Sequence, residues 1–87
     1  MNRAEIESKL IELAAEQAGV KIEEVTPATH FVNDLEFDSL DVTEYVMKVE
    51  DEFHVNVPDD RIEKLATVRD VTLLIEEEIK KEAPAAQ

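Results

Sequence analysis

Residues 34–47 read DLEFDSLDVTEYVM and contain the clearest helix start in the chain. Asp38 is of a residue type that caps helix N-termini, and apolar residues follow it at helical spacing. At about 100° per residue, four apolar side chains fall within one narrow arc: Val42, Val46, Val49 and Phe53. The pattern predicts a helix over about residues 39–53 with one face turned toward a core.

The opposite side of this predicted helix is mostly acidic. Its residues are Asp41, Glu44, Lys48, Asp51 and Glu52, of which only Lys48 is basic. We expect this stripe, which begins beside Ser39, to face solvent.

The segment before this helix predicts another long helix and then an extended loop. Asn2 and Glu5 resemble a capping box, and Gly19 stands where a helix of about residues 3–18 would end. That helix has an apolar face formed by Ile6, Leu10, Leu13 and Ala14. The loop that follows contains apolar residues that we expect to pin it to the core: Val20, Ile22, Val25, Phe31 and Leu35.

The segment after residue 53 predicts a short helix and a final long one. Val55 and Val57 are interpreted as loop residues, because one short alternating segment has no strand to pair with. Asp59 is expected to cap a short helix near residues 60–65. Thr67 with Asp70 opens the last helix. The inward-facing residues of these two helices are expected to be Ile62 and Leu65, then Val68, Val71, Ile75 and Ile79.

The predicted fold is all-α: a small four-helix bundle with three longer helices, one short third helix and a long loop between helices 1 and 2. A chain of 87 residues is enough for one domain. We assign residues 1–82 to that domain and expect residues 83–87 to form a disordered C-terminal tail.

The charge of the chain bears on its partners. It has 22 acidic and 9 basic residues, so its formal net charge is -13. That charge repels nucleic acid and anionic membranes and favours basic protein surfaces, although acidity can also serve solubility alone. Without cysteine, the chain forms no disulfide or thiolate site. With no apolar run that could span a membrane or act as a secretory signal, we expect a cytoplasmic monomer.

The sequence does not favour an enzyme or a metal site. Ser39 lacks the flanking glycines of a hydrolase nucleophile, and His30 and His54 lie in predicted loops. Asp34, Glu36 and Asp38 match positions 1, 3 and 5 of a calcium-binding EF-hand loop. Positions 6 and 12 are then Ser39 and Tyr45 instead of glycine and glutamate, so no metal site is predicted.

The 34–47 segment resembles the signature of the acyl carrier protein family, in which the serine of Asp-Ser-Leu carries 4'-phosphopantetheine. The resemblance continues through residues 50–53 (EDEF), 57–59 (VPD), 63–64 (EK) and 67–68 (TV). It implies a carrier and not an enzyme. A phosphopantetheinyl transferase would move the arm from coenzyme A to Ser39, and the arm would carry acyl intermediates as thioesters in fatty acid biosynthesis.

The resemblance also implies two further sets of site residues. Enzymes with basic surface patches, the transferase and acyl-processing enzymes, would bind a surface that comprises Asp38, Leu40, Asp41, Glu44, Met47 and Asp51. The acyl chain would be sheltered by apolar residues of the bundle: Val46, Val49, Phe53, Ile62, Leu65 and Val68.

Four residues depart from the family pattern. Glu36 and Phe37 replace a common Gly-Ala and resemble polyketide-type or other specialised carriers. Thr43 is expected on the helix flank where an acyl chain enters, and Tyr45 is expected to cover part of the helix surface. A carrier of polyketide or aminoacyl groups and an unmodified acidic interaction module therefore remain alternatives at this stage.

Overall fold

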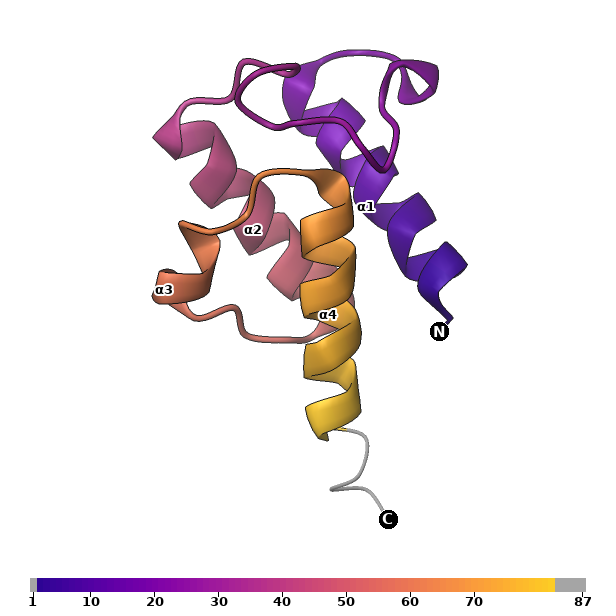
Figure 1. Cartoon of the computed structure of the whole chain (residues 1–87), viewed down its shortest axis with the longest axis vertical. Helices are drawn as coiled ribbons and strands as arrows, with labels where there is room; N and C mark the ends of the chain where they lie inside the picture. Colours follow the sequence, from indigo (N-terminus) through magenta and orange to yellow (C-terminus); the bar gives the residue numbers. More distant parts are fainter. Residues whose placement is uncertain (1, 83–87) are drawn as a thin grey trace.

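The computed structural model describes residues 2–82, so the tail predicted for residues 83–87 lies outside the described residues. The helices are α1 (Arg3–Ala18), α2 (Ser39–Phe53), α3 (Asp59–Ile62) and α4 (Val68–Glu82), with a short 3-10 helix, η1 (Ile22–Glu24), after α1. Helix α1 packs against both α2 and α4, while α3 is a short turn of helix joined to α4 by a turn (Figure 1). The all-α bundle is therefore confirmed.

Helices α1 and α2 both begin with a capping box. In α1, the Glu5 backbone N–H donates to Asn2 Oδ1 over 2.9 Å, and the Asn2 N–H donates to the Glu5 carboxylate over 3.0 Å. In α2, the Asp41 N–H donates to Asp38 Oδ1 over 2.8 Å, and the Asp38 N–H donates to Asp41 Oδ2 over 3.2 Å. These capping boxes satisfy backbone donors that a helix start otherwise leaves unpaired.

The short third helix differs from the prediction. It runs from Asp59 to Ile62, starting one residue earlier and ending three residues sooner than expected. Pro58 occupies the N-cap position, so Asp59 lies inside the helix and does not cap it. Proline suits this place because its fixed φ suits a helix start. The chain then leaves the helix through a turn in which the Leu65 N–H donates to the Ile62 carbonyl.

The long loop between α1 and α2 is fastened to the start of α4. The Phe31 N–H donates to the Ala66 carbonyl over 2.9 Å, and the Val68 N–H donates to the Thr29 carbonyl over 3.2 Å. Among residues 2–82 this contact forms one antiparallel bridge and no strand. Phe31 and Val25 are buried as predicted, but the prediction for Ile22 is wrong: it is 53% exposed on η1.

The core is lined by the inward faces of α1, α2 and α4 and by the loops. Val55 and Val57 lie in a loop, as predicted, and both are buried. The prediction that Tyr45 covers the helix surface is wrong, since only 1% of it is exposed. Its hydroxyl donates to the Leu10 carbonyl over 3.0 Å, which gives the phenol a partner inside the core and makes its burial possible.

Within residues 2–82, the helices are too short or too polar to cross a membrane.

Candidate functional site

Ser39 is the first residue of α2 and is exposed. Its hydroxyl makes no hydrogen bond with the residues that the structure describes, whereas its carbonyl accepts a bond of 2.9 Å from Thr43 Oγ1. A helix start presents backbone N–H groups and the positive end of the helix dipole, and both favour an anion nearby. The serine hydroxyl is thus open to solvent at a helix end suited to a phosphate diester.

Acidic side chains surround this helix start. Asp38 and Asp41 hold the capping box described above, so capping explains both of them. Gln17 of α1 donates to Asp41 over 3.4 Å and to Glu44 over 3.0 Å. These bonds fix two carboxylates beside Ser39 and tie the end of α1 to the beginning of α2.

The outer face of α2 combines acidic and apolar residues. Leu40 and Met47 are 63% and 59% exposed, and Glu44 and Asp51 are exposed as well. Met47 and Asp51 line a cavity of about 430 Å³ with Gln17. Exposed leucine and methionine among carboxylates is an arrangement that suits binding to an apolar surface rimmed with basic residues.

A second cavity, of about 330 Å³, opens directly beside Ser39. It is lined by residues from the loop, α2, α3 and the turn after it: Val32, Ser39, Val42, Thr43, Ile62, Glu63 and Leu65. We call it the Ser39 groove. It gives an apolar surface within reach of any group attached to the serine.

The structure brings only part of the predicted acyl-binding set to this groove. Ile62 and Leu65 line it, and Thr43 lies on the flank where it was expected. The other four predicted residues are buried in the core and do not line it: Val46, Val49, Phe53 and Val68. Val42 was assigned only to the core arc, although its spacing of three residues from Ser39 places it on the same side of the helix. Val32 comes from an irregular loop, where sequence spacing gives no such signal.

Three aromatic rings form a cluster in the core behind the start of α2. Phe37 stacks on Phe31 with ring centroids 5.6 Å apart, and Tyr45 lies 5.0 Å from Phe31 and 6.1 Å from Phe37. All three are at least 96% buried. Burial raises the pKa of the Tyr45 phenol, which therefore stays neutral and able to donate its bond to Leu10.

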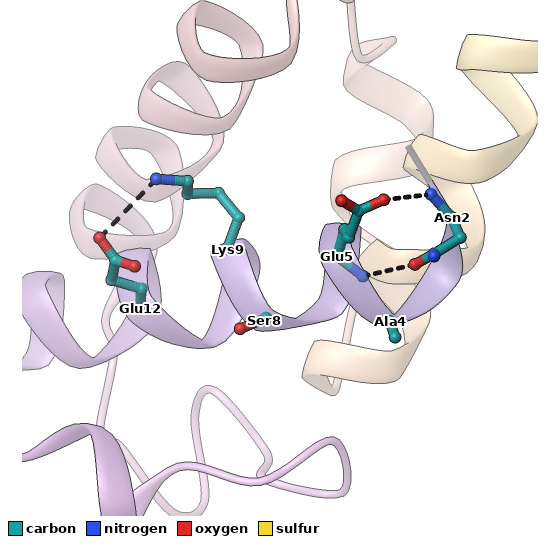
Figure 2. A pocket seen from close by; sticks show the side chains of 6 residues that line it. All are labelled: Asn2, Ala4, Glu5, Ser8, Lys9 and Glu12. Atoms are coloured by element: carbon teal, nitrogen blue, oxygen red, sulfur yellow. Dashed lines mark hydrogen bonds and ion pairs between the residues drawn. The ribbon is translucent and has the colours of Figure 1, made fainter.

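The other serine of the chain lies in a different setting. Ser8 is exposed on α1 and borders a cavity of about 530 Å³ (Figure 2). That cavity is larger than the Ser39 groove, but its lining comes from α1 and its cap alone: Asn2, Ala4, Glu5, Ser8, Lys9 and Glu12. Its walls are the capping box and the Lys9–Glu12 ion pair (Figure 2). Ser8 itself lies within α1 and not at its start, and the lining of its cavity comes from this one helix and its cap.

The two histidines have structural roles. His30 Nδ1 accepts bonds of 3.2 Å and 3.1 Å from the backbone N–H groups of Val32 and Asn33, which close the turn before Phe37. His54 ends α2 in the left-handed conformation, with φ of 57°. Neither side chain forms a hydrogen bond with Ser39.

Comparison with known proteins gives consistent matches. A family model described as the phosphopantetheine attachment site matches residues 8–75. An acyl carrier protein of Thermotoga maritima is similar over 93% of this chain and 94% of its own, with 33% sequence identity and a TM-score of 0.78. An acyl carrier protein of Enterococcus faecalis is similar over 90% of this chain and 99% of its own, with 29% identity and a TM-score of 0.75. The family match spans all of α2 and α3.

Proposed function

Because the chain belongs to the acyl carrier protein family, whose cofactor is covalent 4'-phosphopantetheine, we propose that the arm is attached to the hydroxyl of Ser39. The observation that carries this proposal is the setting of that hydroxyl. It is exposed at the first residue of a long helix and opens onto the Ser39 groove. Ser8 is also exposed, but it lies within α1 and not at the start of a helix.

The residues around Ser39 fit the chemistry of attachment. The hydroxyl is accessible to a phosphopantetheinyl transferase carrying coenzyme A, and the first turn of α2 favours the phosphodiester that results. The carboxylates of Asp38 and Asp41 repel the phosphodiester anion. Their capping bonds explain why they are present. The attached group supplies a terminal thiol, which the cysteine-free chain lacks, and this thiol holds an acyl group as a thioester.

The exposed surface of α2 is proposed as the binding surface for the transferase and for acyl-processing enzymes with basic patches. Its residues are Asp38, Leu40, Asp41, Glu44, Met47 and Asp51. Surface charges of this kind raise association rates while adding little net affinity, which suits a carrier that must leave each enzyme. Substituting Glu44 and Asp51 with their amides should slow modification more than the same change at Glu23 and Glu24 of η1. Equal effects would argue against a specific surface.

The bundle is proposed to shelter the acyl group at the Ser39 groove. Ile62 and Leu65 would contact it first. The remaining candidates, Val46, Val49, Phe53 and Val68, would contact it only where the core parts. A group bound by the folded state alone stabilises that state, so acylation should raise the unfolding midpoint.

We propose fatty acid biosynthesis in the cytoplasm as the setting, with the carrier acting as a monomer because two copies of charge -13 repel each other. Sedimentation velocity would show a dimer if the protein is not a monomer.

A carrier of polyketide intermediates is the second candidate. It is favoured by Phe37 and Tyr45, which fill the core where smaller residues would leave room. Loading assays with each class of acyl group would separate the two.

The attachment itself is tested by intact-protein mass spectrometry. The chain is incubated with coenzyme A and a broad-specificity phosphopantetheinyl transferase, alongside a known carrier as a positive control. Wild type and Ser8→Ala should each gain the mass of one phosphopantetheine, whereas Ser39→Ala should gain none. Wild type that stays unmodified while the control carrier is labelled would favour the acidic interaction module instead.

A further inference from the structure

The Ser39 groove lies at the surface of the bundle, outside the buried core. Its apolar walls are only partly buried or exposed, and none of its lining residues belongs to the buried core cluster. Val42, Ile62 and Leu65 instead pack against that cluster from outside. An acyl chain that enters beside Ser39 therefore meets the core after a short path.

One buried side chain close to the groove residues is held in place by several contacts. Tyr45 follows the groove residue Val42 by three residues, and its ring contacts Phe31, which directly precedes the groove residue Val32. Tyr45 is also the largest of the fully buried side chains, and its ring contacts those of Phe31 and Phe37. The bond from its hydroxyl to the Leu10 carbonyl anchors the ring across the bundle to α1.

Moving this ring is unfavourable for two reasons. The phenol would lose its buried partner, and a buried donor without a partner carries the full cost of its desolvation. The ring would also lose its contacts with two other aromatic side chains. A leucine at the same position would have no hydrogen bond to break and could change rotamer.

From this geometry we propose that Tyr45 limits the acyl group that the carrier shelters to short chains. Acyl groups that fit the Ser39 groove are held inside, whereas the distal carbons of longer chains stay in solvent. This inference rests on attachment at Ser39. It adds a residue that sets the substrate class of the same site.

The test compares unfolding midpoints across an acyl series. Wild type, Tyr45→Leu and Tyr45→Phe are loaded with acetyl, butyryl, hexanoyl, octanoyl, decanoyl and myristoyl groups, and each midpoint is compared with that of the same variant carrying the bare arm. Ile6→Val is the control, because it removes a buried methylene from α1 but leaves the Tyr45–Leu10 hydrogen bond in place.

Each methylene that enters the bundle should raise the midpoint by up to a few degrees. Wild type and Ile6→Val should stop rising at octanoyl or earlier. The midpoint of Tyr45→Leu should continue to rise through the longer chains. The chain length at which the midpoint of Tyr45→Phe stops rising should lie between those of wild type and Tyr45→Leu, since this variant keeps the ring but loses the hydrogen bond to Leu10.

Two results would overturn the proposal. One is a wild-type midpoint that keeps rising to myristoyl. The other is a midpoint that stops rising, in both Tyr45 variants, at the same chain length as in wild type. If Tyr45→Leu fails to fold, the wild-type series and Tyr45→Phe decide the matter. Failure of the proposed function is distinguishable, because the chain would then gain no phosphopantetheine mass and no series could be prepared.

Discussion

Helices α1 and α2 are nearly the same length and open with the same capping box, yet only α2 begins with a serine. In α1, Ser8 lies within the helix, where backbone donors are used by the helix itself. In α2, Ser39 lies at the first turn and beside a groove formed with α3 and the loop. If the arm is attached to Ser39 as proposed, the difference teaches that exposure alone does not make an attachment site, and that the larger of two cavities need not be the functional one.

The two helices also differ in what holds them. Helix α1 is joined to α4 by two ion pairs, Arg3–Glu76 at 2.8 Å and Arg69–Glu7 at 2.7 Å. The start of α2 is held by the Gln17 hydrogen bonds described above and by Phe37, which is buried directly before the cap. Removing each kind of support should affect stability to a different extent.

Phe37→Ala should have the largest effect. It removes a buried ring that stacks on Phe31, and losses of this kind cost about 3–5 kcal/mol of unfolding free energy. Urea denaturation followed by circular dichroism would measure it. Val32→Ala is the control, because Val32 is 53% exposed and should change stability by less than about 0.5 kcal/mol. Similar losses in both variants would contradict the role given to Phe37.

The two capping boxes should differ by a smaller amount. Asp38→Ala should lower the unfolding free energy by about 1–2 kcal/mol and Asn2→Ala by about 0.5–1 kcal/mol. The Asp38 bond is charge-assisted and lies in the middle of the chain, whereas the first turn of α1 can fray. Urea denaturation again gives both values, and Asp38→Asn, which retains a capping oxygen, is the control. A larger loss in Asn2→Ala would reverse the comparison.

The ends of the two helices offer a test with opposite signs. Gly19 ends α1 with φ of 72°, and His54 ends α2 with φ of 57°. Side chains with a Cβ are strained in this region, so Gly19→Ala should destabilise by about 1 kcal/mol and His54→Gly should stabilise by about 0.5–1 kcal/mol. Scanning calorimetry would record the shifts. A Cβ at Gly19 meets nothing within 4 Å, so a loss there reports backbone strain and not a clash.

The smallest expected effect concerns the ion pair between α1 and α4. A side-chain hydrogen bond from Arg3 lowers the pKa of Glu76, so the folded state holds the proton of this carboxyl more weakly than the unfolded chain does. The resulting stability is present above the ordinary carboxyl pKa and is lost as the pH falls through the lowered value. Glu76→Gln should therefore be slightly less stable than wild type near neutral pH.

That difference should shrink to nothing in acid, because wild-type Glu76 is then protonated as well. Urea titrations of both proteins across the acid range would show it. Glu12→Gln, which removes an exposed carboxylate from the surface of α1, is the control substitution. A gap between wild type and Glu76→Gln that persists in acid would mean that the pair does not act through charge.

Much of this fold follows from local sequence. The capping residues Asn2 and Asp38, the left-handed Gly19 and the apolar arc of α2 each act within a few positions along the chain, so their pattern predicts helices with correct ends. Thr67 and Asp70 behave in the same way: the Asp70 carboxylate accepts from the Thr67 N–H over 3.0 Å. Helix α3 was less well predicted, because Pro58 took the cap position that Asp59 was expected to hold.

The groove and the aromatic cluster could not be predicted in the same way, because they depend on contacts between distant segments. Tyr45 was expected on the surface, and only the approach of α1 supplies the Leu10 carbonyl that its hydroxyl needs. Val32 lines the groove because backbone bonds fasten its loop to the start of α4, and no local spacing predicts that contact. The position of Ser39 at a helix start was predicted from its neighbour Asp38.

The most direct test of the central claim is to find which serine carries the arm. Modified wild-type protein would be digested, and tandem mass spectrometry would locate the added phosphopantetheine in the resulting peptides. We predict that all of the label lies on the peptide that contains Ser39 and that the Ser8 peptide stays unmodified, even with excess transferase. Label on Ser8, or on any residue other than Ser39, would contradict the claim that the start of α2 is the attachment site.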